Sequence, residues 1–180
     1  MAAKSNFTNM ALCLFAVCAV CAALLGVVYA VTKAPIEAAA AAEAKAAIAE
    51  VLPEGGQISE ALEADGCEYY ESRSGDEVLA YAVKTSTNGF GGLLSLMVGV
   101  LPDGTIYNTK VLSHSETPGL GAKCTSDPKF TAQWKGFPSG GNLTVKKDGG
   151  DVDAITASTI TSRAYSLAVL NARKLVESLQ

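Results

Sequence analysis

The run from Met10 to Val31 contains no charged residue, and Lys4 and Lys33 bound it. As an α-helix, such a run is long enough to cross a hydrocarbon core of about 30 Å. We therefore predict one transmembrane anchor within an N-terminal segment, residues 1–33. The alternative is a cleaved secretory signal, because Val28-Tyr29-Ala30 resembles a signal-peptidase site.

Residues 34–56 are predicted to form a stalk helix that leads into the folded domain. Pro35 suits the first turn of a helix, and the alanine-rich run up to Ile48 has high helix propensity. The segment Pro53-Glu54-Gly55-Gly56 then ends the helix.

Residues 57–180 have the pattern of one α+β domain, in which an antiparallel sheet packs against helices. Strands are predicted at 78–83, 93–101 and 105–112, with a short strand around Leu143 to Val145. A loop is expected from Ser113 to Gly141, and a turn at Asp148-Gly149-Gly150. From Ser162 onward, apolar residues recur at helical spacing, at Tyr165, Val169, Ala172, Val176 and Leu179.

The start of that last helix is rich in hydroxyl side chains. Thr156, Ser158, Thr159, Thr161 and Ser162 lie where unpaired backbone N–H groups and the positive end of the helix dipole favour an anion such as phosphate. Ser and Thr are also common helix caps, so capping is the alternative interpretation.

The segment Thr156-Ala157-Ser158-Thr159 resembles the Ser/Thr-Gly-Ala-Thr flavinylation motif of the FMN-binding subunits of Rnf and Na+-translocating NADH:quinone reductase (Nqr) complexes. The resemblance implies that Thr159 carries covalent FMN through a phosphoester bond, attached by a flavin transferase. Ala157 stands where this family usually has Gly, and Ser158 where it usually has Ala. The first change matters if the backbone there needs a positive φ.

A second stretch supports the same resemblance. Gly89-Phe90-Gly91-Gly92 and the segment from His114 to Gly121 are similar to the family's glycine-rich strand entry and its His-x-Glu-Thr-Pro-Gly-Leu-Gly segment. The resemblance covers nearly the whole chain and implies a loop that faces the flavin. Its predicted cofactor-binding residues are His114, Glu116, Thr117, Gly119, Leu120 and Gly121. Gly119 and Gly121 would let the backbone approach the planar ring, and Arg163 is the candidate for a charged contact with the phosphate.

Other classes of site have little support in this chain. The net charge is −4 with no basic cluster, which argues against a nucleic-acid partner. The only histidine, His114, has no partners for a metal site or a nucleophilic triad, so no metal and no catalytic residue are predicted. The only tryptophan, Trp134, is expected in the core or on a partner-facing patch, with stacking on a flavin as the alternative.

The five cysteines divide into two groups. Cys13, Cys18 and Cys21 lie in the predicted anchor, where cysteine usually serves as a small apolar residue. Cys67 and Cys124 lie in the predicted domain, and either a disulfide or two free thiols is consistent with the sequence.

The predicted function is electron relay by a membrane-anchored flavoprotein. The resemblance, which is strongest to the G subunit of Rnf, implies a place in a ferredoxin:NAD+ oxidoreductase coupled to Na+ or H+ translocation, with other subunits of that membrane complex as partners. It also implies a single-pass protein of the cytoplasmic membrane with its FMN domain on the extracytoplasmic side, an orientation that the lysines flanking the anchor leave open. The alternatives are the C subunit of Nqr, or an anchored flavin-binding sensor or adaptor without a redox role.

Overall fold

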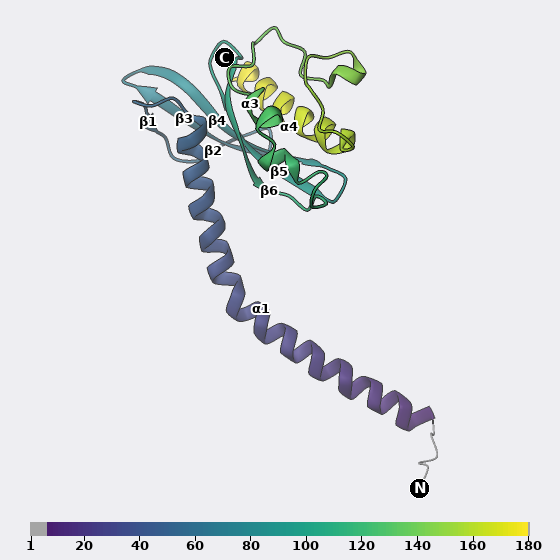
Figure 1. Ribbon diagram of the computed structural model, residues 1–180. Coiled ribbons are helices and arrows are strands. Elements are labelled where there is room, and N and C mark those ends of the chain that lie inside the picture. Colours follow the sequence, from purple (N-terminus) through teal and green to yellow (C-terminus); the bar gives the residue numbers. More distant parts are fainter. Residues whose placement is uncertain (1–6, 180) are drawn as a thin grey trace. The chain divides into compact units, whose positions relative to one another are not determined.

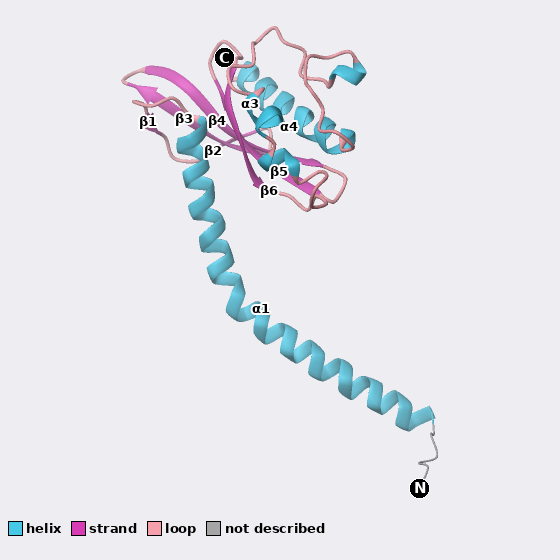
Figure 2. Cartoon of the chain, in the orientation of Figure 1, coloured by secondary structure: helices cyan, strands magenta, loops and turns pink. Residues whose placement is uncertain are grey.

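The computed structural model of the chain describes residues 7–179 (Figures 1 and 2). Contacts within the chain divide it into two units, residues 1–42 and residues 43–180. Lys4, the first of the two lysines that bound the apolar run, lies outside the described residues.

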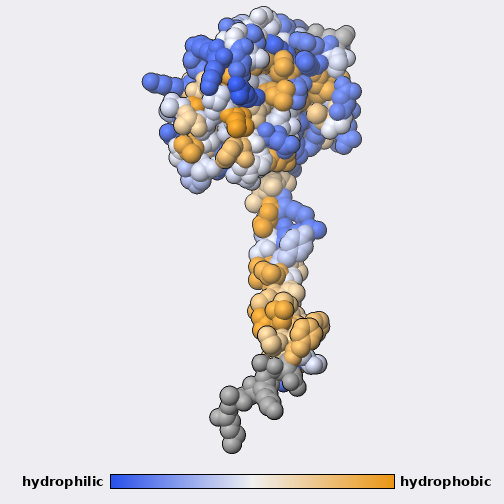
Figure 3. Space-filling view, turned by 90° about the vertical axis from the view of Figure 1, so that its right-hand side faces the viewer, coloured by the Kyte–Doolittle hydropathy of each residue, from blue (hydrophilic) through white to orange (hydrophobic). Residues whose placement is uncertain are grey.

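The first unit consists of most of helix α1 (Phe7–Val51). Among residues 7–179, α1 is the one helix whose length and composition allow it to cross a membrane. Its apolar side chains are exposed from Phe7 to Ile36, as Figure 3 shows along the shaft of the helix. A signal sequence near an N-terminus has the same properties, so both interpretations of the run stand.

The prediction that a separate helix begins at Pro35 is wrong. Helix α1 continues through Pro35, although proline has no N–H group to donate to the carbonyl one turn earlier. The alanine-rich stretch that follows Pro35 has high helix propensity, which favours continuing the helix past this one missing hydrogen bond. The helix ends at Val51, just before the predicted Pro53-Glu54-Gly55-Gly56 stop.

The second unit contains one six-stranded antiparallel sheet. Its strands are β1 (Gln57–Ile58), β2 (Leu62–Ala64), β3 (Cys67–Ser74), β4 (Glu77–Asn88), β5 (Leu93–Val100) and β6 (Ile106–Ser113). The order is β1-β3-β4-β5-β6, with β2 also paired to β3. The strands predicted at 78–83, 93–101 and 105–112 correspond to β4, β5 and β6, so the expected antiparallel sheet is confirmed.

Helix α4 (Thr159–Ser178) covers one face of this sheet. Its apolar stripe, which includes Tyr165, Val169 and Ala172, packs against side chains of β4 and β5 such as Val83 and Val98. The period-3.6 pattern of the helix and the period-2 pattern of the strands meet in the main core.

The other face of the sheet is covered by the last turns of α1. Ile48 and Val51 pack there against Ala80 and Ala82 of β4. A Cβ atom on Gly99 of β5 would lie 1.8 Å from the carbonyl oxygen of Val51, so only glycine admits the helix end at this distance. Small side chains on one face of β4 and β5 therefore explain why the helix docks on this face.

Aromatic side chains fill the space beside α4. Trp134 is fully buried and stacks on Tyr165 with ring centroids 4.9 Å apart, and Phe130 meets both rings edge to face. The expectation of a core tryptophan is confirmed, and the alternative of stacking on a flavin is wrong because the indole has no exposed face.

The segment between β6 and α4 differs from the prediction. The expected loop contains two short helices, α2 (Lys123–Ser126) and α3 (Pro128–Ala132), and a 3-10 turn follows at Lys146–Asp148. The strand expected around Leu143 to Val145 is wrong, because Val145 forms only an isolated bridge with Val152. There the Asp151 side chain accepts a hydrogen bond from the N–H of Asn142, and the Asn142 side chain accepts one from the N–H of Thr144. Such local hydrogen bonds compete with the backbone hydrogen bonds of a β-ladder.

Cys67 and Cys124 are both free thiols, one in β3 and the other buried in α2. The sequence allowed either a disulfide between them or two free thiols, and the structure has the free thiols.

Candidate functional site

The candidate site is built around the first turn of α4. Thr159 is the first residue of the helix and Ser158 its N-cap, but the Ser158 side chain makes no capping hydrogen bond. Ser162 supports the turn instead: its Oγ accepts the N–H of Ile155 at 2.9 Å and donates to the carbonyl oxygen of Ser158 at 3.0 Å. The Ser162 hydroxyl is therefore fully buried and committed to the fold.

Ala157, just before the cap, adopts a φ of +62°. The N–H of Ser158 donates to the carbonyl of Ile155 at 3.0 Å and closes a tight turn with Ala157 as its third residue. That position of a type II turn needs a positive φ and favours glycine. In this backbone conformation an alanine is less favourable than the glycine that the family usually has here, by about 1–2 kcal/mol of folding free energy.

Glu116 connects three segments of the chain and is only 6 % exposed. Its Oε2 accepts the hydroxyl of Thr161 at 2.8 Å, and its Oε1 accepts the N–H of Phe90 at 2.8 Å. Among the described residues no lysine or arginine pairs with this carboxylate. The positive end of the α4 dipole lies on the same side and favours the negative charge.

Gly89, in the loop between β4 and β5, and Gly121, in the loop after β6, leave space for the Glu116 side chain. A Cβ atom on Gly121 would lie 2.3 Å from Glu116 Oε2 and 2.7 Å from Thr161 Oγ1, and one on Gly89 would lie 2.0 Å from Glu116 Oε1. Gly89 also closes the tight turn between β4 and β5, because its N–H donates to the carbonyl oxygen of Gly92. Gly119 is different, because it has a φ of +77° but open space around it.

A shallow hollow of about 180 Å³ lies where these segments meet. It is lined by Phe90, Glu116, Thr117, Leu120, Gly121, Ala157, Ser158, Thr159, Ile160 and Thr161. Its rim is apolar, since Phe90, Leu120 and Ile160 are 70 %, 44 % and 50 % exposed. The Thr159 side chain is half-buried, and its hydroxyl makes no hydrogen bond to any described residue.

The structure thus brings most of the predicted site residues together, from segments far apart in the sequence. Glu116, Thr117, Leu120 and Gly121 meet Ser158, Thr159 and Thr161 in the hollow. Phe90 and Ile160 belong to the same site but were not among the predicted residues. The signal for Ile160 was in the sequence, because a large apolar residue next to Thr159 lies off the apolar stripe of α4.

Five predicted residues do not line the hollow: Thr156, Ser162, Arg163, His114 and Gly119. The Arg163 guanidinium holds the Asp148 carboxylate through two hydrogen bonds of 2.6 and 2.7 Å, and this lowers the pKa of Asp148. The predicted contact between Arg163 and a phosphate stays a prediction that this geometry does not support. His114 supports the loop, since its Nδ1 accepts the N–H of Glu116 at 3.2 Å.

The arrangement fits the phosphate end of a flavin nucleotide. The first turn of α4 offers backbone N–H groups that lack helical partners, the dipole adds positive potential, and Thr159 offers an unused hydroxyl. The apolar rim suits a planar ring. Within residues 7–179 no group of three His, Cys, Asp or Glu side chains is arranged to hold a metal ion.

Comparisons with known proteins identify two regions of the chain. Residues 89–174 match the family described as the FMN-binding domain, and residues 1–51 match the family described as the RnfG N-terminal region. The hollow and the first turn of α4 both lie within the first of these regions.

The chain is also similar to individual proteins. The chain is 34% identical to the G subunit of an ion-translocating oxidoreductase complex from Erwinia tasmaniensis, over 89% of this chain and 85% of the relative. It is 38% identical to the G subunit of a proton-translocating ferredoxin:NAD(+) oxidoreductase complex from Clostridium ljungdahlii, over 58% of this chain and 57% of the relative. A solved structure, the C subunit of the Na(+)-translocating NADH-quinone reductase from Parabacteroides distasonis, is similar with a TM-score of 0.47 and 22% identity, over 72% of this chain and 78% of that chain.

Proposed function

Since this chain belongs to the family of G subunits of ion-translocating oxidoreductase complexes, we propose that it is a membrane-anchored electron carrier with FMN bound covalently to Thr159. One observation carries the proposal. The Thr159 hydroxyl, on the first residue of α4, lines the hollow and has no hydrogen-bond partner among the described residues. The Ser158 hydroxyl shares both properties, but Ser158 is buried whereas Thr159 is half-buried. The nearby hydroxyls of Thr161 and Ser162 are both engaged in the fold.

Each residue around Thr159 has a distinct role in this proposal. The helix N-terminus would hold the phosphate through backbone N–H groups. The Thr159 oxygen would lose its proton and displace the leaving group of an activated FMN donor, so that it becomes the ester oxygen. Glu116 and Ser162 are positioning residues: Glu116 ties Thr161 of α4 to the backbone of Phe90, and Ser162 ties the same helix turn to the backbone of Ile155 and Ser158. Phe90, Leu120 and Ile160 would offer apolar contacts to the ring. When bound, FMN supplies the redox chemistry, which the protein tunes through placement and electrostatics.

The small size of the hollow is compatible with covalent attachment, which does not require the protein to enclose the flavin. Pockets that hold a small molecule by contacts alone usually enclose about 300–1,000 Å³. This hollow measures about 180 Å³, so it covers only part of a flavin. A phosphoester bond keeps the flavin in place without enclosing it, and the uncovered part of the ring is accessible for electron exchange with a neighbouring cofactor.

The likeness to the Clostridium ljungdahlii protein extends the proposal to the complex. We infer that the chain assembles with other subunits of a membrane complex that passes electrons between ferredoxin and NAD+ and moves Na+ or H+. A flavin transferase attaches FMN during maturation. We propose that helix α1 is the anchor and that the FMN domain lies on the extracytoplasmic side; the resemblance to Rnf G subunits supports this orientation.

Denaturing-gel fluorescence tests the proposal. The full chain is produced with and without an active flavin transferase, because only a covalent flavin stays with the unfolded chain. We expect a fluorescent band for the native sequence and for Ser158→Ala, which removes a neighbouring hydroxyl, but none for Thr159→Val. A dark band for the native sequence with the transferase active would favour the non-redox sensor or adaptor.

A further inference from the structure

Strand β6 forms one edge of the sheet, and part of its outer side is open. At its start, the N–H of Ile106 donates to the carbonyl oxygen of Phe137 at 2.9 Å, so that end is already paired. The register against β5 shifts at Tyr107 and again at Leu112. Between these bulges, residues 108–111 pair regularly with β5, and within residues 7–179 no strand pairs with their outer side. Alternate residues of such an edge direct both N–H and C=O outward.

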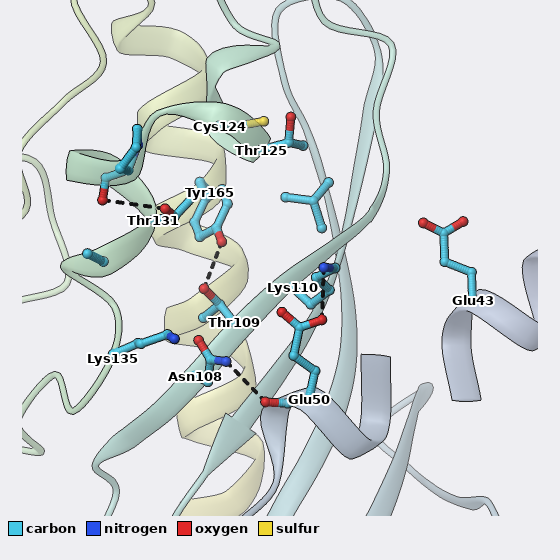
Figure 4. A pocket seen from close by; sticks show the side chains of 13 residues that line it. Glu43, Glu50, Asn108, Thr109, Lys110, Cys124, Thr125, Thr131, Lys135 and Tyr165 are labelled. Carbon is cyan, nitrogen blue, oxygen red and sulfur yellow. Dashed lines mark hydrogen bonds and ion pairs between the residues drawn. The ribbon is translucent and has the colours of Figure 1, made fainter. Parts of the chain in front are cut away.

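A trench of about 520 Å³ runs along this open edge (Figure 4). Four consecutive residues of β6 line it: Asn108, Thr109, Lys110 and Val111. Consecutive side chains of a strand point to opposite faces of the sheet, so a space that touches all four follows the edge and not one face. The trench is deepened by α2 and α3 on one side and by the end of α1 on the other, as Figure 4 shows.

The two walls of the trench differ in chemistry. The wall that faces α4 is largely apolar, with Val111, Cys124, Pro128, Ala132 and the ring of Tyr165. The opposite wall is polar, since Lys110 pairs with Glu50 at 2.8 Å and the Asn108 amide donates to the Glu50 carbonyl at 3.0 Å. Two charged side chains of the lining, Lys135 and Glu43, have no ion-pair partner among the described residues.

We propose that a lone extended segment of a neighbouring subunit binds in this trench and adds to β6 as a further strand. The proposal rests on the proposed function, because the partner is a subunit of the same complex. Backbone hydrogen bonds to residues 108–111 supply affinity, and alternate side chains enter the two walls. The segment spans about 13 Å at ~3.3 Å per residue, alternates apolar and polar residues, and carries a carboxylate that meets Lys135.

The walls also disfavour pairing between the β6 edges of two copies of this chain. Each β6 edge is flanked by its own α2, α3 and α1 end, which would meet those of the other copy before the strands reached the ~4.8 Å spacing of a sheet. A single segment without flanking helices fits.

Hydrogen exchange on the unmodified protein tests the proposal directly. The full-length chain is compared in its purified, detergent-solubilised form and in the intact complex from native membranes. We expect amide exchange within residues 108–111 to be slowed at least roughly tenfold in the complex. The reason is that the outward N–H groups gain hydrogen-bond acceptors there. Equal exchange in the two samples would overturn the proposal, as would the same protection in a purified dimer of this chain.

A pair of variants gives a second measurement. Ala132→Arg places a long side chain in the trench, and Ser126→Arg places the same side chain on the neighbouring helix α2, outside the trench. We expect Ala132→Arg to lower co-purification of the other subunits at least several-fold, and Ser126→Arg to leave it unchanged. Both variants should keep full FMN on Thr159, and that readout separates this proposal from the proposed function. Normal assembly of Ala132→Arg with retained exchange protection would contradict it.

Discussion

At the scale of single residues, Ala157 has the most strained backbone of the candidate site. Its φ of +62° lies in the left-handed region, which a Cβ atom disfavours. The turn that requires this conformation also sets the direction in which Thr159 enters the hollow. The strain is therefore held in place by the hydrogen bonds of Ser158 and Ser162, not by Ala157 itself.

We predict that Ala157→Gly stabilises the folded domain by about 1 kcal/mol and retains flavin attachment. Relief of the left-handed strain exceeds the extra entropy that glycine has in the unfolded chain. Denaturant unfolding measures the change. Ala154→Gly is the matched control, because Ala154 has no positive φ and should lose up to ~1 kcal/mol. A loss of stability in Ala157→Gly would show that the turn does not strain this residue.

Cys124 should be unreactive in the folded protein, in contrast to Cys67. Burial raises the pKa of the Cys124 thiol to about 11, so roughly one thiol in a thousand is ionised at pH 8. Because its folded pKa lies above the ordinary value of 9, this thiol stabilises the fold fully below pH 9 and less as the pH rises toward 11. Alkylation at pH 8 with peptide mapping should label the half-buried Cys67 first and Cys124 only after denaturation. A disulfide-linked peptide, or equal labelling, would contradict this.

At the scale of elements, the loop from His114 to Gly121 and the start of α4 act as one unit through Glu116. The sequence predicted that both belong to one site, but it treated Gly119 and Gly121 alike. The structure separates them, because Gly121 lies against Glu116 and Thr161 whereas Gly119 lies in open space.

We predict that Gly121→Ala costs the domain several kcal/mol of unfolding free energy and reduces flavin attachment, since a Cβ atom would displace the Glu116 carboxylate. Gly119→Ala should cost only about 1 kcal/mol, from backbone strain at φ +77°, and should keep the flavin. Denaturant unfolding and flavin content, read on the same samples, distinguish the two. Equal effects of both substitutions would mean that Glu116 does not anchor the loop.

The elements that the sequence predicted well are those with strong apolar periodicity. Strand β5 is apolar on both faces and α4 has a clear stripe, so both were found within a few residues. Strand β3 was missed because its sequence, CEYYESRS, is polar and half-exposed. Strand β4 runs past its predicted end because Thr87 is buried and donates to the carbonyl of Ala164, a contact that no local pattern reveals. Helix α3 was missed although Asp127 and Pro128 are a typical helix start.

The site shows the same division between local and long-range information. The motif around Thr159 and the His114–Gly121 segment were recognisable locally, and so was the helix N-terminus between Ser158 and Ser162. Two of the predicted side chains are hydrogen-bonded to distant partners: Arg163 to Asp148, 15 residues away in the chain, and Thr161 to Glu116, 45 residues away. Sequence spacing gives no measure of such distances, so these two side chains could not be assigned before the fold was known.

At the scale of the whole molecule, the proposed function requires α1 to remain as an anchor. We predict that the chain stays in the membrane pellet after alkaline carbonate washing, with its N-terminus uncleaved. The exposed apolar surface of α1 from Phe7 to Ile36 is the reason, because it needs a lipid environment. Recovery of a soluble chain that begins near Val31 would identify the run as a signal peptide.

Protease added to intact spheroplasts should digest the domain, and protection there would reverse the proposed orientation.

Covalent attachment of FMN to Thr159 is tested at the level of the bond by peptide mass spectrometry of the chain from a host with an active flavin transferase. We predict an FMN mass on the tryptic peptide from Asp148 to Arg163, localised to Thr159. Thr159→Val keeps the shape of the side chain and should fold normally, but this mass and electron transfer through the complex should both be lost. Thr156→Val should retain some FMN, because Thr156 lies outside the hollow. An FMN mass on Ser158 would contradict the assignment of Thr159, and an unmodified peptide would contradict the covalent carrier itself.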